Sequence, residues 1–217
     1  MNHRRRARII GLSVLCMAAS SFVAKPAFAA PSTSGTSSAP VASCNGDKNV
    51  DIFNFNDFHG RIATGANLFT PVVEARNANG ADKVLLLDAG DNVGGSTFES
   101  GSLNDEPTID VLNAAGVDAN AVGNHEFDKG LDDLQGRVES RAQFPVLSAN
   151  LVDPTSKEPV LTSHAVFDVD GVRVAVIGAS PNELYATTTG AGLKGNEVLD
   201  EVAAVNAVAD ELAAQDA

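Results

Sequence analysis

The chain has 217 residues, of which 44% are hydrophobic and 20% are charged, and its formal net charge is −13. This is the composition of a globular protein with enough apolar residues for one sizeable core. The excess of acidic residues disfavours non-specific binding to nucleic acids and to anionic membranes, because both are negatively charged.

The first 29 residues have the pattern of a secretory signal peptide. A basic segment, residues 3–8, precedes an uncharged apolar run from Ile9 to Val23, and Ala27 and Ala29 place small side chains at the two positions that a signal peptidase reads. The apolar run is shorter than the roughly 20 residues of a membrane-spanning helix, which disfavours the alternative of a membrane anchor. We therefore expect cleavage after Ala29, secretion or retention in the cell envelope, and no transmembrane segment in the mature chain.

Residues 30–48 follow as a segment rich in Ser, Thr, Pro and Ala, which we predict to be a flexible lead-in. Cleavage leaves ten basic against 28 acidic residues, a net charge of −18, and Cys44 as the only cysteine, so no internal disulfide can form. A lipid anchor on Cys44 is a minor alternative, because the apolar segment it requires is not immediately upstream. Residues 49–217 are the predicted folded part.

From residue 50 onward, apolar runs typical of buried strands alternate with helical patterns. Strands are predicted at residues 50–55, 83–87, 119–122, 145–149, 164–169 and 172–178, with Asp170-Gly171 as a hairpin turn between the last two. Helices are predicted at residues 69–77, 107–115, 131–141 and 196–214. In the last helix, the predicted core face consists of Val198, Val202, Val205 and Leu212. This order predicts a single layered α/β domain.

Polar clusters directly follow the first three predicted strands, at residues 56–59, 88–91 and 124–128. In open α/β sheets, sites form beyond the carboxyl ends of the strands. We therefore expect the three clusters to share one site. Asp57 and His59 would point to the same side if the chain stays extended between them, and could hold one ion. Taken alone, this pair is better explained as solvated loop residues, and Asp91 as a turn or cap residue.

The third cluster, Gly-Asn-His-Glu-Phe-Asp at residues 123–128, is more specific. Asn124 offers an amide oxygen as a metal ligand, His125 follows it, and the Asp128 carboxylate can orient the imidazole. The alternative is a capped loop in which Asp128 binds local amides. Glu126 is expected to form a local hydrogen bond, and Phe127 to pack under the loop.

Four segments, NFNDFHGRI, LLLDAGDNVGGS, AVGNHEFDKG and FPVLSANL, occur in this order and together resemble the N-terminal part of the 5′-nucleotidase family, which belongs to the calcineurin-like two-metal phosphoesterases. The resemblance covers residues 50–215. It implies a layered α/β sandwich of the metallophosphoesterase type. It also implies an exported hydrolase that acts on nucleotides or related phosphate esters.

The resemblance further implies roles for individual residues. Asp57 and His59 would bind one divalent ion, Asp91 would bridge two ions, and Asn124 would bind the second. The ions would be Mn²⁺, Zn²⁺ or Mg²⁺ and would activate a water for attack on phosphorus. His125 would stabilise or protonate the departing oxygen as one half of a catalytic pair. Asp128, the other half, would hold the tautomer of His125.

Members of this family complete the metal centre with histidines farther downstream and bind the nucleoside base with a C-terminal domain. His164 is expected to be an edge-strand residue and not a ligand. We therefore expect a truncated N-terminal part with an incomplete sheet and metal site, which would act alone or with its missing part in trans. The alternatives are an inactive remnant or a secreted domain that binds metal or nucleotide weakly. A nuclease or a sugar-nucleotide hydrolase is a third reading, although the acidic charge disfavours nucleic acid as a partner.

Overall fold

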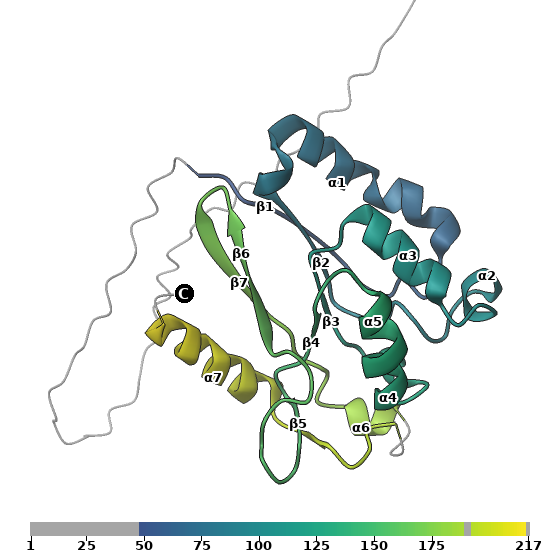
Figure 1. Ribbon diagram of the computed structural model, residues 1–217, viewed down its shortest axis with the longest axis vertical. Helices are drawn as coiled ribbons and strands as arrows, with labels where there is room; N and C mark the ends of the chain where they lie inside the picture. The colour runs from purple at the N-terminus through teal and green to yellow at the C-terminus, as the bar shows by residue number, and fades with distance from the viewer. Residues whose placement is uncertain (1–47, 189–191, 216–217) are drawn as a thin grey trace, which may run out of the picture. The chain divides into compact units, whose positions relative to one another are not determined.

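The computed structural model describes residues 48–188 and 192–215 (Figure 1). The predicted signal peptide, residues 1–29, and the predicted lead-in before Lys48 lie outside these described residues, as does Cys44. Within the described ranges, no helix combines the length and the apolar character needed to cross a membrane.

The centre of the fold is a parallel sheet of four strands in the order β1-β2-β3-β4 (Figure 1). Its strands are β1 Asp51–Phe55, β2 Val84–Asp88, β3 Ala119–Ala121 and β4 Val146–Leu147. The predicted strands at these places are confirmed, although β4 is shorter than expected. Register pairs Phe55 with Asp88, and Asp88 with Asn120. Because the strands are parallel, the loops that leave β1, β2 and β3 start from the same edge of the sheet.

Helical segments connect the strands. The longer ones are α1 Gly65–Asn79, α3 Glu106–Ala115 and α7 Glu201–Ala214. One helical stretch, residues 131–141, is made of α4 Leu131–Asp133, the π-helical η4 Leu134–Val138 and α5 Glu139–Arg141. Short turns of helix are α2 Phe98–Gly101, α6 Leu184–Thr187, η1 Ile62–Thr64, η2 Ala81–Lys83 and η3 His125–Phe127. As predicted, α3 has a proline in its first turn and ends at Gly116, where φ is 69°.

Two groups of buried apolar side chains hold the strands and helices together. One group joins α1 and α3 to β1 and β2, and includes Phe69, Leu112 and Leu86. The other lies beneath the loop that follows β3, and includes Phe127 and Leu134, which are both 0% exposed. Phe127 therefore packs under its loop, as expected. These contacts fix the strand ends from which the polar loops emerge.

A hairpin formed by β6 His164–Val169 and β7 Val172–Ile177 confirms the turn predicted at Asp170-Gly171. Both turn residues have positive φ, as a two-residue hairpin turn requires. The hairpin tip donates a hydrogen bond from the Asp170 amide to the Asp82 carbonyl at 3.0 Å, and its end receives one at the Gly178 carbonyl from the Ala149 amide at 2.8 Å. These hydrogen bonds therefore hold the hairpin to residues next to the start of β2 and the end of β4.

The predicted start of the last helix is wrong. Residues 197 and 198 form β8 Glu197–Val198, which pairs with β5 Leu151–Val152. The helix α7 begins only after Asp200, whose carboxylate accepts a hydrogen bond from the Ala203 amide at 2.8 Å as an N-cap. Val202, predicted to face the core, is 62% exposed, whereas Ala204 and Leu212 are buried.

Candidate metal centre

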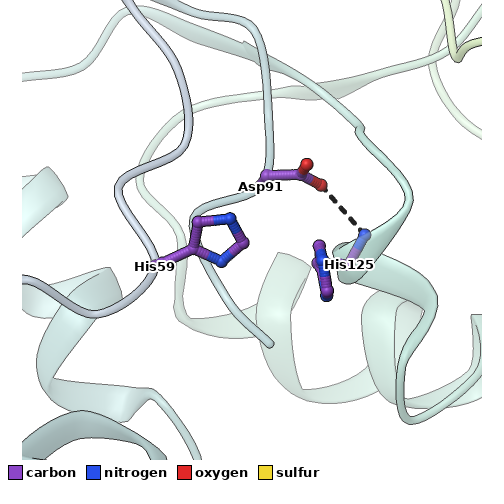
Figure 2. A group of neighbouring side chains, drawn as sticks. All are labelled: His59, Asp91 and His125. Atoms are coloured by element: carbon purple, nitrogen blue, oxygen red, sulfur yellow. Dashed lines mark hydrogen bonds between the residues drawn. The ribbon is translucent and has the colours of Figure 1, made fainter. Parts of the chain in front are cut away.

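Three loops at the carboxyl ends of neighbouring strands bring His59, Asp91 and His125 together (Figure 2). His59 follows β1, Asp91 follows β2, and His125 begins the short helix η3 after β3. Their ligand atoms all lie within 4.8 Å of one another, and the two imidazole rings meet edge to face with centroids 4.8 Å apart. The group is partly accessible to solvent, so an ion could reach it.

The backbone at this site is not extended. Asp57, His59 and Asp91 have φ of 56°, 45° and 58°, so the premise that an extended chain aligns Asp57 with His59 is wrong. Such left-handed conformations cost non-glycine residues on the order of 1 kcal/mol each and persist where surrounding bonds enforce them. Here the Asp57 amide donates to Gly90 O at 3.0 Å, and the His59 amide donates to Asp91 O at 3.1 Å. The loop after β1 is therefore shaped by the loop after β2.

His59 is oriented by a backbone carbonyl. Its Nδ1 lies 2.8 Å from Gly94 O. Because a carbonyl oxygen only accepts, Nδ1 carries the proton and Nε2 is left with a free lone pair. Nε2 lies 3.6 Å from Asp57 Oδ1. A backbone carbonyl that holds the second ring nitrogen is the usual support of a metal-binding histidine.

Glycines allow the loops to approach this closely. A Cβ at Gly90 would lie 2.3 Å from the Gly123 nitrogen, and a Cβ at Gly123 would lie 2.3 Å from Asp91 Oδ1. At Gly95, a Cβ would stand 3.3 Å from both His59 Nδ1 and His125 Cε1. The space between the imidazoles is therefore kept open by the absence of a side chain.

Glu126 ties two of the site loops together. It is only 3% exposed, and its carboxylate accepts from the amides of Asp91 at 2.9 Å, Asn92 at 2.8 Å and Gly123 at 2.8 Å. Burial raises the pKa of Glu126, while the three amide donors favour its ionised form. The sequence suggested only a local hydrogen bond, and the structure adds two bonds to the loop after β2. The positions of Asp91 and His125 thus depend on this buried carboxylate.

A second buried carboxyl group, Asp88, lies at the end of β2. Its oxygens accept from the Gly90 amide at 3.0 Å, from Asn120 Nδ2 at 3.0 Å and from Asn92 Nδ2. Burial raises the pKa of Asp88 to about 8, against the lowering effect of these hydrogen bonds. The Asp88 carboxyl group therefore holds the loop after β2 through its hydrogen bonds with Gly90 and Asn92.

His125 and Asp128 form a pair across one turn of η3. His125 Nδ1 lies 3.0 Å from Asp128 Oδ2, and the backbone amide of His125 donates to Asp91 Oδ1 at 2.9 Å. The pKa of His125 is raised, chiefly by the hydrogen bond with Asp128 and further by the nearby carboxylates of Asp91 and Glu126. With Asp128 accepting at Nδ1, the opposite nitrogen, Nε2, is available to a substrate atom or an ion.

The remaining predicted site residues lie near this group but outside it. The Asp57 side chain is 56% exposed and touches the group only through His59. Asn124 directly precedes His125, and its side-chain amide forms no hydrogen bond with any other described residue. His164 begins β6, with Nδ1 2.9 Å from Ser163 Oγ, and is not part of the group.

One buried acidic residue near the site was missed. Asp105 precedes α3, is 3% exposed, and accepts from the Gly94 amide at 3.1 Å. The only signal in the sequence was an aspartate before Glu-Pro, which is typical of an N-cap. The side chain does not cap the helix, so this signal would have indicated a different role.

The donor set fits a divalent metal. Two imidazoles and a carboxylate are a combination that Zn²⁺ and Mn²⁺ accept, and hard oxygen ligands extend the choice to Mg²⁺. The open space beside Gly95 and the preset Nδ1–H tautomer of His59 agree with this use.

Comparison with known proteins assigns the class of the fold. No family model matches the chain. The crystal structure of a 5′-nucleotidase precursor from Thermus thermophilus superposes with a TM-score of 0.58 at 27% identity, over 76% of this chain and 35% of that one. A 5′-nucleotidase of Vibrio parahaemolyticus is 32% identical over 164 residues, which are 70% of this chain and 29% of the relative. Endonuclease YhcR of Bacillus subtilis is 37% identical over 139 residues, 59% of this chain and 11% of the relative.

The fold and the similarities define a metallophosphoesterase. The chain belongs to the 5′-nucleotidase family and matches the N-terminal portion of its members. It spans 29% of the length of the Vibrio 5′-nucleotidase and 11% of the length of endonuclease YhcR.

Proposed function

We propose that this chain supplies metal ligands and a catalytic pair to an exported phosphoesterase of the 5′-nucleotidase type, which hydrolyses nucleotides or related phosphate monoesters. The observation that carries the proposal is the convergence of His59, Asp91 and His125 beside the His125–Asp128 hydrogen bond. Export rests on the signal-peptide pattern of residues 1–29.

The residues would divide the work as follows. His59 and Asp57 would bind one ion, Asp91 would bridge, and Asn124 would bind a second. Two divalent ions, when bound, polarise phosphoryl oxygens and lower the pKa of a bound water. The hydrogen bond with Asp128 raises the pKa of His125 and favours the imidazolium, which would donate a proton or a hydrogen bond from Nε2 to the departing oxygen.

Polynucleotide cleavage is the second candidate. It is favoured by the 37% identity to a protein named an endonuclease. The net charge of −13 opposes it, since a chain with a net negative charge repels a polyanionic substrate. We therefore place mononucleotides first.

The test is Mn²⁺-dependent phosphate release from AMP by the purified chain, with single-stranded DNA as the competing substrate. His125→Ala should abolish release, whereas His164→Ala, a histidine outside the group, should leave it intact. Release that persists without metal or in His125→Ala would contradict the proposal. Cleavage of DNA without release from AMP would favour the nuclease. Binding of Mn²⁺ by a folded chain without any turnover would favour the non-catalytic secreted domain.

A further inference from the structure

Within the part of the chain that the structure describes, Asp105 is a buried carboxyl group with one unpartnered oxygen. It precedes α3 but does not cap it, and among the described residues it forms no ion pair. Its Oδ1 is buried without a hydrogen-bond partner in the described part of the chain, and its φ is 61°. An unpartnered buried polar atom costs roughly 1–3 kcal/mol and a left-handed aspartate adds to this, so Asp105 lowers stability where a small apolar residue would not.

The other oxygen of Asp105 anchors the segment that lines the metal group. Oδ2 accepts from the Gly94 amide at 3.1 Å. Gly94 and Gly95 have φ of 76° and 55°, and two consecutive glycines leave the backbone little intrinsic preference. The segment is also tightly placed, because a Cβ at Gly94 would lie 2.4 Å from Asp128 Oδ2. A flexible segment in such a narrow position needs an external anchor, and Asp105 supplies one.

The same glycine carries the carbonyl that holds His59. Gly94 O lies 2.8 Å from His59 Nδ1 and also accepts from Ser96 Oγ at 3.3 Å. Asp105 and His59 therefore bind the amide and the carbonyl group of the same residue, Gly94. A small cavity of about 20 Å³, whose lining includes Asp105, Gly94, His125 and Asp128, adjoins this contact.

We propose that Asp105 is a positioning residue that, through Gly94, fixes the tautomer and the orientation of His59. The link runs from Asp105 Oδ2 to the Gly94 amide, and from the Gly94 carbonyl to His59 Nδ1. It keeps the proton on Nδ1 and directs Nε2 toward the metal group. The benefit for metal binding rests on the proposed function, whereas the effect on His59 exists without metal.

Asp105→Gly tests the link, because glycine accepts the positive φ and removes the side chain that bears the carboxyl group. Asn104→Gly is the matched control, since its φ of 56° is similar and Asp105 stays in place. Asp105→Asn retains an oxygen acceptor and should rescue. Nitrogen-15 spectra of the metal-free chain should show His59 protonated at Nδ1 in the wild type, the control and the rescue variant. In Asp105→Gly, the Nδ1–H form should be lost to a mixture.

Mn²⁺ titration of the same proteins separates the two proposals. Loss of a residue that supports a ligand typically weakens metal binding by about 10–100-fold, and we expect at least about tenfold for Asp105→Gly. A changed tautomer in Asp105→Gly, together with a wild type that binds no Mn²⁺, would support the positioning role and overturn the proposed function. A folded Asp105→Gly chain with the wild-type tautomer would overturn the positioning role.

Hydrogen exchange of the wild type tests the anchor if Asp105→Gly does not fold. The Gly94 amide, bound to Asp105, should exchange much more slowly than the Gly95 amide, which donates to no described residue. Equal exchange rates of the two amides would overturn the proposal.

Discussion

Replacing Glu126 by Gln should loosen both loops that carry Asp91 and His125. The carboxylate accepts three amide hydrogen bonds, two on Oε2 and one on Oε1. A glutamine has only one oxygen. If it takes the place of Oε2, the bonds from Asp91 and Gly123 survive without charge, and the NH₂ group faces the Asn92 amide donor to donor.

The expected cost follows from these contacts. A hydrogen bond to a charged group contributes about 1.5–3 kcal/mol, and a buried donor left without an acceptor costs about 1–3 kcal/mol. Weakening of the two surviving hydrogen bonds increases this cost in stability, and partial relaxation of the loops reduces it. We expect a loss of about 3 kcal/mol in the free energy of unfolding. That is a large share of the roughly 5–15 kcal/mol of a typical domain, yet it leaves the chain mostly folded.

The assay is urea unfolding at pH 7.5 with chelator present, followed by circular dichroism. Glu139→Gln is the matched control, because this glutamate is outside the site and receives no hydrogen bond from any described residue; it should change stability by less than about 0.5 kcal/mol. A Glu126→Gln chain within about 0.5 kcal/mol of the wild type would refute the view that this carboxylate joins the loops.

Further predictions concern the surroundings of the site. Because burial raises the pKa of Asp88 to about 8, the folded chain keeps a proton that the unfolded chain releases between about pH 4 and about pH 8. With chelator present, the free energy of unfolding should therefore fall by a few kcal/mol at most as the pH rises through this range. Asp88→Asn should flatten this fall in urea titrations, leaving the part of the same sign that Glu126 contributes; an unchanged slope would contradict this. Gly123→Ala should destabilise the chain by at least about 2 kcal/mol in thermal melts, because its Cβ would meet Asp91. The control Gly136→Ala, whose Cβ meets nothing within 4 Å, should be neutral or stabilising. Equal melting points of the two variants would contradict the close contact between Gly123 and Asp91. Arg76→Ala should cost about 2 kcal/mol, because it removes bonds to two carbonyls at the end of α3, each 2.7 Å long; a loss too small to measure by urea unfolding would show that these bonds contribute little.

Much of the fold could be predicted because its signals are local. The apolar runs at β1 and β2 and the turn at Asp170-Gly171 depend on neighbouring residues, and all were confirmed. The start of α7 failed because Val198 pairs with Leu151, a partner 47 positions away that no local pattern indicates. Val202 was misplaced for the same reason, since the helix was counted from the wrong residue.

The candidate site shows the same contrast between features with local signals in the sequence and features that depend on distant residues. The polar clusters were recognisable because each directly follows a strand. The left-handed backbone of Asp57 and His59 was not, because it is imposed by hydrogen bonds from the loop after β2. The reach of Glu126 across two loops and the anchor at Asp105 are likewise long-range contacts of single side chains. The ligand and catalytic roles themselves stay predictions.

The central claim is that His59, Asp91 and their neighbours hold a divalent metal, and Mn²⁺ binding to the metal-free chain measured by calorimetry tests it most directly. We predict binding by the wild type and by His164→Ala, with at least about tenfold weaker binding by His59→Ala and Asp91→Asn. Binding that is the same in all four proteins, or no binding by a folded wild type, would contradict it.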